Sequence, residues 1–394
     1  MLTAPQKSIV TATVPLLEAG GEGLTTHFYR IMLGEYPEVR PLFNQAHQAS
    51  GDQPRALANG VLMYAKHIDR LEALGPLAAQ IVNKHVALQV QPEHYPIVGT
   101  CLLRAIREVL GAEVATDEVI EAWAAAYGQL ADILIGAERQ VYDRNAAAPG
   151  GWRGARAFEV VRKEAESDEI TSFYFSPVDG QPVLDFQPGQ YIGIRLKVDG
   201  QDIQRNYSLS AAPNGKTYRI SVKREEGGVA SGYLHDHIQP GSVVELFPPA
   251  GAFTLEPGDR PLVLISGGVG ITPTLAMLDE ALKTSRVVHF IHCARHRGVH
   301  AFRQTVEALA EKHPQLKRFY CYEEAHDGAD APHAVGRLDA QKLQRWLPAG
   351  TTDIDAYFLG PKPFMKQVKD ALRTLGVPDA QARYEFFGPA AALE

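Results

Sequence analysis

The stretch LVLISGGVGITP, residues 262 to 273, decides the fold of the last third of the chain. Its apolar start predicts a strand buried on both faces, and a second apolar run follows at 287–291 after a helical stretch. A strand, a helix and a strand in this order predict the parallel sheet of an α/β domain. We expect Thr272 to cap the helix and Pro273 to be its first residue.

The glycines of this stretch also predict a phosphate-binding turn. Glycine lets the backbone approach a pyrophosphate closely, and the N-terminus of the following helix offers unpaired N–H groups and a partial positive charge. A tight turn that binds nothing is an equal alternative for this segment taken alone. The residues expected to contact a bound nucleotide are Gly268, Val269, Gly270, Ile271, Thr272 and Pro273.

The whole chain has 394 residues, which is room for two or three domains. Its formal net charge of -7 gives no broad basic surface, so no binding of nucleic acid is expected. The cysteines Cys101, Cys293 and Cys321 lie far apart and form no Cys-x-x-Cys motif, which indicates a reducing compartment. The N-terminus lacks the pattern of a signal peptide and no apolar run is long enough to cross a bilayer, so we expect a cytoplasmic protein.

The sequence changes character at a linker rich in Ala, Pro and Gly, residues 145–151. Before the linker, apolar residues recur every three or four positions, which predicts an all-helical domain over 1–144. After it the apolar period falls to two, with Gly and Pro between the runs, which predicts an antiparallel β-barrel over 152–257. The parallel α/β domain is expected over 258–394, so the predicted fold is multidomain.

Five short segments of the second half follow one another in a characteristic order. They are PGQY at 188–191, RNYS at 205–208, KREEGGVAS at 223–231, LGPKPFM at 359–365 and YEFFGP at 384–389. In this order and at this spacing they resemble the ferredoxin-reductase-like flavoproteins. The resemblance implies that the barrel binds FAD and that the α/β domain binds NAD(P)H.

The same resemblance implies roles for single residues. Arg205 would contact the flavin diphosphate, for which its planar fork is suited, Tyr207 the isoalloxazine and ribityl region, and Phe387 would stack on the flavin ring. Leu359 stands where a cysteine is common, and Phe386 replaces a smaller residue, which would affect the placement of the nicotinamide. Ordinary core packing is the alternative for Phe386 and Phe387. The implied cofactor contacts are Tyr191, Arg205, Asn206, Tyr207, Ser208, Gly227, Gly228, Ser231, Glu385, Phe386, Phe387, Gly388 and Pro389.

In the helical domain, one histidine lies on a predicted apolar helix face. Leu77, Ile81, His85 and Leu88 are spaced four, four and three residues apart. A histidine in such a place is more often a satisfied core residue than a metal ligand. Glu138 continues an apolar stripe on the last helix, where a buried carboxylate would need a hydrogen-bond donor such as an imidazole. The alternative for Glu138 is a place near the helix end, facing water.

Further segments of the helical domain match the globins in their order: FY at 28–29, PLFN at 41–44, GDQ at 51–53, NKH at 83–85, PEHYP at 92–96 and AYG at 126–128. Together with the reductase segments, they make the whole chain resemble a flavohaemoglobin, which is a globin fused to a flavin reductase. The family implies that His85 is the proximal ligand of the haem iron and that Tyr95 and Glu138 form hydrogen bonds behind it. The other implied residues are Tyr29 and Gln53 over bound dioxygen, Phe43 and Leu57 at the porphyrin, and Lys84 and Glu385 between haem and flavin.

The resemblance implies a nitric oxide dioxygenase. NAD(P)H would reduce FAD, FAD would reduce the haem b, and dioxygen on the ferrous haem would convert nitric oxide to nitrate. Dioxygen and nitric oxide would be the small-molecule substrates, no protein partner would be required, and a lipid in the distal haem pocket is a further candidate ligand.

Three alternatives to this function stay open. They are a haem-based binder or sensor of oxygen or nitric oxide, a hydroperoxide reductase that uses the same electron chain, and a helical docking module without haem. The choice between NADH and NADPH is open as well, because Arg295 and Arg297 could meet either a 2'-phosphate or solvent.

Overall fold

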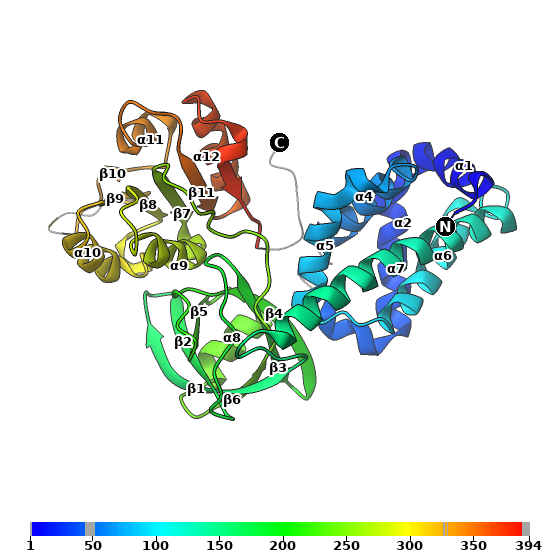
Figure 1. Ribbon diagram of the computed structural model, residues 1–394, viewed down its shortest axis with the longest axis horizontal. Helices are drawn as coiled ribbons and strands as arrows, with labels where there is room; N and C mark the ends of the chain where they lie inside the picture. The colour runs from blue at the N-terminus through cyan, green and yellow to red at the C-terminus, as the bar shows by residue number, and fades with distance from the viewer. Residues whose placement is uncertain (1, 44–51, 326–327, 329, 388–394) are drawn as a thin grey trace. The chain divides into compact units, whose positions relative to one another are not determined.

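The structure is a computed structural model that describes residues 2–43, 52–325, 328 and 330–387, the side chains of 52 and 53 excepted. It divides near Ala147 into two compact units, which are described separately. In Figure 1 the first unit runs from blue to teal and the second from green to red. Within the ranges given, no helix combines the length and the apolar character needed to cross a membrane.

The described part of the first unit is built from helices, as the apolar periodicity predicts. Its first helix starts at a capping box, in which the side chain of Thr3 accepts from the N–H of Gln6 and the side chain of Gln6 accepts from the N–H of Thr3. The elements are α1 (Ala4–Ala12), α2 (Val14–Glu35), the 3-10 helix η1 (Pro37–Leu42), α4 (Asp52–Lys66), η2 (Leu71–Leu74), α5 (Gly75–Ala87), α6 (His94–Leu110) and α7 (Asp117–Ala147).

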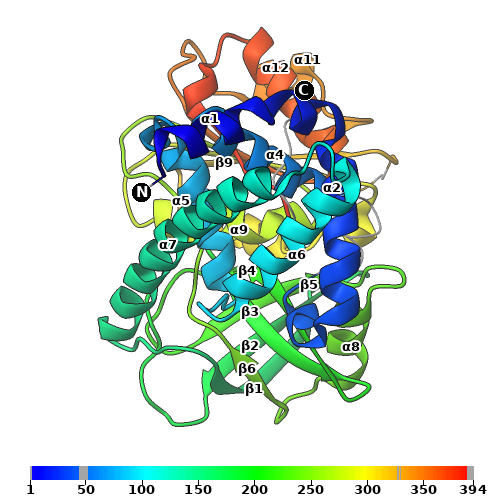
Figure 2. The same cartoon turned by 90° about the vertical axis from the view of Figure 1, so that its right-hand side faces the viewer.

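A single apolar core holds these helices together. α2 packs against α4 and α6, and α6 also packs against α7, so that α6 lies between α2 and α7 (Figure 2). Leu24, Phe28 and Met32 of α2 are almost fully buried and belong to the same core as Trp123 of α7. Helix α2 therefore forms one wall of the interior in which the candidate site lies.

The second unit begins with an antiparallel sheet. Its strands are β1 (Arg156–Ala165), β2 (Ile170–Pro177), β3 (Tyr191–Val198), β4 (Gln201–Ser208), β5 (Tyr218–Lys223) and β6 (Val243–Leu246), with α8 (Val229–His237) between the last two. They pair in the order β4-β3-β6-β1-β2-β5, and a bridge between Leu209 and Ile220 joins the residue after β4 to β5. This bridge closes the sheet, which confirms the predicted barrel.

The rest of the second unit is a parallel α/β sheet, also as predicted. Its strands pair in the order β10-β9-β8-β7-β11-β12, and all five pairs are parallel. All six residues of the central strand β7 are buried. The elements are β7 (Leu262–Gly267), η3 (Gly268–Gly270), α9 (Ile271–Ala281), β8 (Val288–Ala294), η4 (Arg297–Val299), α10 (Arg303–Lys312), β9 (Leu316–Tyr322), β10 (Ala334–Val335), α11 (Ala340–Trp346), β11 (Asp355–Leu359), α12 (Lys362–Thr374), η5 (Asp379–Gln381) and β12 (Ala382–Tyr384).

The predicted start of α9 is wrong by two residues. The turn after β7 tightens into the 3-10 helix η3, and α9 starts at Ile271 with Gly270 in the cap position. Thr272 is therefore inside the first turn, and its hydroxyl donates to the carbonyl oxygen of Val269 at 3.0 Å instead of capping the helix. Glycines allow this tighter turn, since Gly268 has a φ of 55°.

Candidate functional site

Three polar side chains from three helices meet in the helical unit. His85 lies near the end of α5, Tyr95 in the first turn of α6 and Glu138 on α7. Nδ1 of His85 is 2.7 Å from Oε1 of Glu138, and the hydroxyl of Tyr95 donates to the same oxygen at 2.6 Å. The Tyr95 hydroxyl is also 3.2 Å from Nδ1 of His85. The structure thus brings together the three residues predicted for the proximal side of a haem.

Glu138 is 2% exposed, so the alternative in which it faces water is wrong. A buried carboxylate is costly unless donors satisfy it, and His85 and Tyr95 both supply a donor. Burial, followed by the hydrogen bond to Glu138, raises the pKa of Tyr95 far above its ordinary value, so its hydroxyl stays protonated. Because Glu138 accepts from Nδ1 of His85, this nitrogen carries the hydrogen and Nε2 keeps its lone pair.

The imidazole of His85 is not packed into the core. Its side chain is 32% exposed, and Leu77 and Ile81 on the same helix face are only half-buried. α5 instead buries Val82 and Val86. The apolar stripe of α5 around His85 is therefore only partly covered by other residues. Among the described residues, Nε2 of His85 has no hydrogen-bond partner.

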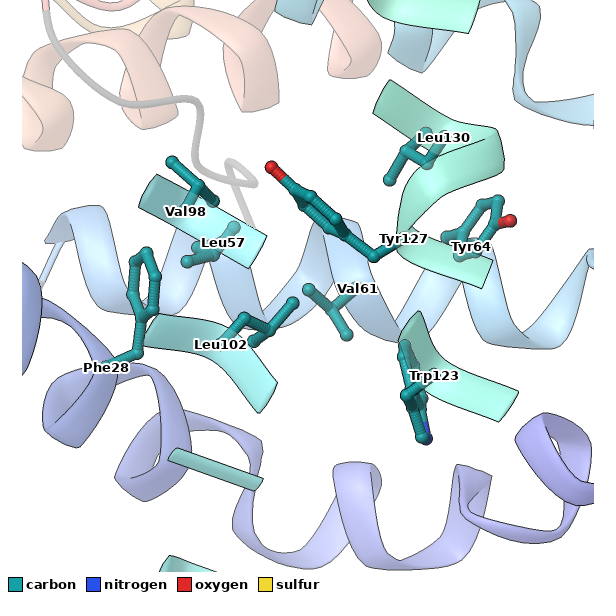
Figure 3. A pocket seen from close by; sticks show the side chains of 9 residues that line it. All are labelled: Phe28, Leu57, Val61, Tyr64, Val98, Leu102, Trp123, Tyr127 and Leu130. Atoms are coloured by element: carbon teal, nitrogen blue, oxygen red, sulfur yellow. The ribbon is translucent and has the colours of Figure 1, made fainter. Parts of the chain in front are cut away.

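An apolar pocket with a cavity volume of about 60 Å³ lies between α2, α4, α6 and α7 (Figure 3). It is lined by Phe28, Leu57, Val61, Tyr64, Val98, Leu102, Trp123, Tyr127 and Leu130. Both tyrosine hydroxyls are satisfied by the backbone, since Tyr64 donates to the carbonyl oxygen of Ala126 at 2.8 Å and Tyr127 to that of Tyr95 at 2.7 Å. Burial raises the pKa of Tyr64 to about 12. The pocket consequently suits apolar groups.

Tyr127 connects the pocket to the polar network, because its ring lines the pocket and its hydroxyl holds the backbone of Tyr95. A Cβ at residue 99 would lie 2.6 Å from Cε1 of Tyr127, so only glycine at this position lets the ring lie against α6. The apolar lining, the exposed imidazole and its fixed Nδ1 hydrogen all fit a haem with His85 as iron ligand. That role stays a prediction.

The predicted distal residues lie on α2 and α4. Tyr29 is 7% exposed, and its ring contacts those of Phe28 and Phe43 edge-on, with centroid distances of 4.9 and 5.6 Å. Leu57 lines the pocket. Gln53 belongs to α4, but its side chain is outside the described residues.

Sequence reasoning missed most of the pocket lining. Val61, Val98, Leu102 and Trp123 were not predicted as site residues, although they have the three- or four-residue spacing of buried helix faces. This spacing signals burial only, and it does not distinguish a packed interior from a pocket.

In the second unit, the RNYS motif lies at the end of β4. Its residues Arg205, Asn206, Tyr207 and Ser208 are all half-buried. Arg205 donates to the carbonyl oxygen of Gln204 at 2.6 Å. Oδ1 of Asn206 is buried and finds no hydrogen-bond donor among the described residues. A buried acceptor without a donor lowers the stability of the fold. This oxygen therefore fits a binding site in which a ligand supplies the missing hydrogen-bond donor.

Tyr191 starts β3 and is 5% exposed. Gly251, with a φ of 118°, makes room for it, since a Cβ there would lie 2.7 Å from Cε1 of the tyrosine ring. Burial, with a smaller contribution from the charge of Glu385, raises the pKa of Tyr191. The two charged residues predicted between haem and flavin are each half-buried, Lys84 on α5 and Glu385 directly after β12.

The predicted phosphate turn of the barrel precedes α8. Gly227 has a φ of 69°, and Gly228 is the cap residue of the helix. The hydroxyl of Ser231 accepts from the N–H of Glu225 at 3.2 Å and donates to the carbonyl oxygen of Gly228 at 3.3 Å. Among the described residues no side chain caps α8, so its N-terminus suits an anion.

The glycine-rich turn after β7 packs against the loop that follows β11. A Cβ at Gly270 would lie 2.4 Å from the carbonyl oxygen of Leu359, and a Cβ at Gly360 would lie 2.6 Å from Cδ1 of Phe364. Ile271, Thr272 and Pro273 are buried behind this turn, while Gly268 and Val269 are half-buried. These close contacts explain the glycines, and they bring the two predicted nicotinamide-side segments together.

The C-terminal aromatic residues differ in exposure. Phe386 is 9% exposed and contacts the ring of Tyr384 at 5.8 Å, which agrees with the core alternative. Phe387 is 49% exposed, so the core alternative is wrong for this ring. Gly388 and Pro389 lie outside the described residues.

The two arginines considered for a 2'-phosphate already have carboxylate partners. Arg295 pairs with Glu169 at 2.6 Å and Arg297 with Asp330 at 3.1 Å. Contact with a 2'-phosphate would compete with these ion pairs.

Comparison with known protein families identifies three domains. Residues 26–134 match the globin family, residues 157–255 the oxidoreductase FAD-binding domain and residues 264–370 the oxidoreductase NAD-binding domain. The chain has the domain set of an NAD(P)H-dependent oxidoreductase that uses haem and FAD, in agreement with the predicted cofactors.

Relatives match over the whole chain. A flavohemoprotein from Pseudomonas putida is 68% identical over 394 residues, and one from Pseudomonas aeruginosa is 67% identical over 394 residues, each with 100% of both chains covered. Among solved structures, flavohemoglobin from Malassezia yamatoensis with bound FAD and heme has a TM-score of 0.84 at 27% identity, covering 98% of this chain and 100% of its own. The FAD/NAD-binding domain of nitric oxide dioxygenase from Vibrio cholerae has a TM-score of 0.55 at 39% identity, covering 60% of this chain and 100% of its own. This chain belongs to the flavohemoprotein family, the flavohaemoglobins.

Proposed function

We propose that this protein is a nitric oxide dioxygenase that uses NAD(P)H, dioxygen and nitric oxide and forms nitrate. When bound, FAD takes up the two electrons of a hydride and releases them singly, and haem supplies the iron at which dioxygen and nitric oxide react. All domains lie in one chain, so no protein partner is required. The solved relative from Vibrio cholerae carries this activity in its name, which supports the proposal.

The observation that carries the proposal is the network of His85, Tyr95 and Glu138. The carboxylate of Glu138 fixes the hydrogen of His85 on Nδ1 and directs the lone pair of Nε2 away from the network. Its negative charge makes the imidazole more basic, and the resulting electron donation favours the oxidative chemistry of a bound iron. A globin that only stores oxygen has no need of this pair together with a reductase in the same chain.

Next to Phe28, which lines the pocket, Tyr29 would donate a hydrogen bond to dioxygen and hold it until nitric oxide arrives. Its ring is fixed by the rings of Phe28 and Phe43, so the hydroxyl loses little conformational freedom on binding. Gln53 would be the second polar residue there. The pocket lining is apolar, which favours uncharged diatomic substrates over ions and lets the charged product nitrate leave.

In the second unit, Arg205 and the N-terminus of α8 would hold the FAD diphosphate, and Asn206 would accept a hydrogen bond from the flavin. The turn 268–270 and the N-terminus of α9 would hold the nicotinamide dinucleotide. Phe387, whose ring is 49% exposed, would cover the flavin until the nicotinamide replaces it.

The test is turnover by the full chain loaded with haem and FAD. We expect catalytic consumption of nitric oxide in the presence of NADH and air, with one nitrate formed per nitric oxide, and no sustained consumption without dioxygen. Tyr29→Phe should release dioxygen faster than the unmodified protein in stopped-flow displacement. A single reduction of the haem with no turnover would instead identify a binder or sensor and would refute the proposal.

One alternative activity has an observation of its own. A histidine paired with a carboxylate behind the iron is also typical of haem peroxidases, so the contact between His85 and Glu138 favours reduction of hydroperoxides as a second candidate. Parallel turnover measurements with nitric oxide and with an alkyl hydroperoxide rank the two activities.

A further inference from the structure

Two of the three cysteines lie side by side in the α/β domain. Cys293 on β8 and Cys321 on β9 are direct partners in the parallel register of these strands (Figure 1), and both are free thiols. Adjacent strands are about 4.8 Å apart, which lies within the Cα separation of roughly 4.4–6.8 Å found in disulfides. Register partners also point to the same face of a sheet, so the two sulfurs can be joined without a change of register.

The two thiols already interact. Cys293 forms a side-chain hydrogen bond with Cys321, and Sγ of Cys321 donates to the carbonyl oxygen of Gly336 at 3.1 Å. The hydrogen bond between the cysteines lowers the pKa of Cys321 and raises that of Cys293, and the positive charge of Lys342 on α11 also lowers the pKa of Cys321. Since the thiolate is the reactive form of cysteine, the pair is more reactive than an isolated buried thiol.

The three cysteines differ in exposure and in neighbours. Cys293 is half-buried, whereas Cys321 is 1% exposed, so a small oxidant reaches the sulfur of Cys293 first. Cys101 on α6 is also 1% exposed, and it is the one cysteine in the sequence of the helical domain. It therefore serves as an internal control, a buried thiol without a second cysteine beside it.

The cysteine pair lies next to the predicted nucleotide turn. Gly267, the last residue of β7, is the register partner of Cys293, so Gly267, Cys293 and Cys321 form a row across three strands. At the other end of this row, a Cβ at Gly267 would lie 3.1 Å from Cδ1 of Phe364, which belongs to the second nicotinamide-side segment. A change in the spacing of β8 and β9 is consequently felt at the base of the turn 268–270.

We propose that Cys293 and Cys321 form a hydroperoxide-sensitive dithiol, whose oxidation to a disulfide slows the reduction of flavin by NAD(P)H. The S–S bond brings the two sulfurs to about 2.05 Å and removes the S–H that Cys321 donates to Gly336. Both changes occur in the row that ends at the nucleotide turn. The inference rests on the proposed function only in placing the nicotinamide dinucleotide at this turn.

The oxidation proceeds in two steps. When the pair has lost one proton, the remaining proton moves to Cys321, and the thiolate of Cys293 attacks a peroxide oxygen. An S–O bond forms, the O–O bond breaks, and the leaving alkoxide takes up a proton to give an alcohol. The sulfur of Cys321 then attacks the sulfenic acid of Cys293, an S–S bond forms, the S–O bond breaks, and hydroxide leaves with the proton of Cys321 as water. A small dithiol reverses the oxidation by thiol–disulfide exchange.

The first measurement maps the disulfide in the full chain loaded with haem and FAD. The protein is treated with a small excess of hydrogen peroxide, remaining thiols are alkylated, and peptides are analysed by mass spectrometry without reductant. A parallel sample receives an azodicarboxamide, which oxidises dithiols without iron. We expect both oxidants to link Cys293 to Cys321, with loss of two hydrogens, and to leave Cys101 alkylated. No link with hydrogen peroxide, or an equally oxidised Cys101, would overturn the proposal.

The second measurement is anaerobic stopped-flow reduction of the flavin by NADH. We expect oxidation to slow this reduction by about threefold or more and a small dithiol to restore it, because small displacements near a bound substrate have large effects on rate. Cys293→Ser should not respond to oxidation, whereas the control Cys101→Ser should respond like the unmodified protein. An unchanged rate in the fully disulfide-linked protein, or equal slowing in Cys293→Ser, would refute the effect on flavin reduction.

These outcomes separate the inference from the proposed function. A protein that forms the disulfide and slows accordingly, but does not consume nitric oxide, would refute the proposed function alone. Normal consumption of nitric oxide by a protein in which hydrogen peroxide forms no link between Cys293 and Cys321 would refute the dithiol alone.

Discussion

Replacing Glu138 by Gln tests the polar network directly. The amide has almost the shape of the carboxylate but no charge, so the hydrogen bonds of 2.7 Å from His85 and 2.6 Å from Tyr95 become neutral ones. Hydrogen bonds to a charged group contribute about 1.5–3 kcal/mol and neutral ones about 0.5–1.5 kcal/mol, so each bond loses roughly 1 kcal/mol. The loss at His85 makes its imidazole a weaker donor to a bound iron.

The weaker imidazole donor destabilises oxidised iron more than reduced iron, because the higher charge of oxidised iron depends more on a basic ligand. A change of 1.4 kcal/mol corresponds to about 59 mV in a one-electron couple, so we expect the haem potential of Glu138→Gln to rise by roughly 40 mV. Tyr95→Phe, which keeps the carboxylate and removes only one donor to it, should lower the potential, since all of the charge of Glu138 is then directed at His85.

The assay is a spectroelectrochemical titration of the full chain loaded with haem and FAD, in which the flavin serves as an internal reference. Glu121→Gln is the matched control, because Glu121 is exposed on the same helix α7. A shift of less than about 15 mV, or an equal shift in the control, would refute the reasoning that Glu138 acts on iron through His85.

Buried groups of the α/β domain support three further predictions. Gly270→Ala should slow flavin reduction by NADH on the order of tenfold without changing the haem spectrum, because its Cβ would lie 2.4 Å from the carbonyl oxygen of Leu359; an unchanged stopped-flow rate contradicts this. Burial lowers the pKa of His292 from 6.5 to about 3, so below pH 6.5 the unfolded chain takes up a proton that the folded chain does not. The free energy of unfolding should therefore fall by up to about 1.4 kcal/mol per pH unit between pH 6.5 and pH 3. In urea titrations at several pH values, His292→Leu should remove this contribution to the pH dependence. Asp355→Ala leaves the buried guanidinium of Arg286 without its partner at 2.6 Å and should cost about 3–5 kcal/mol in the same titrations; a loss below about 1 kcal/mol would show that the ion pair is dispensable.

Much of the fold can be predicted from the sequence because the deciding signals are local. Helical spacing before the linker, alternation after it and the continuous apolar run 262–265 each reflect the geometry of one element. Short motifs such as RNYS and the glycine turn are also local, and the structure places them at the end of β4 and in the turn before α9. The start of α9 was missed because a 3-10 turn and a capped helix have similar sequence signals.

The candidate site depended on contacts between distant residues. Tyr95 and Glu138 are 43 positions apart, and spacing on their own helices could not show that one carboxylate oxygen meets both a tyrosine and a histidine. In the same way, the spacing of Phe386 and Phe387 could not show that one ring is buried and the other 49% exposed.

The sequence by itself determined the order of the three domains, the family resemblance and the positions of the motifs, since these follow from residue type and local periodicity. Only the tertiary structure decided that Glu138 is buried with two donors, that the stripe around His85 is only partly covered by protein, and that an apolar pocket lies between α2, α4, α6 and α7. The physical reason is that periodicity fixes the face of a helix on which a residue lies, whereas burial, hydrogen-bond partners and empty space depend on how neighbouring helices pack against that face.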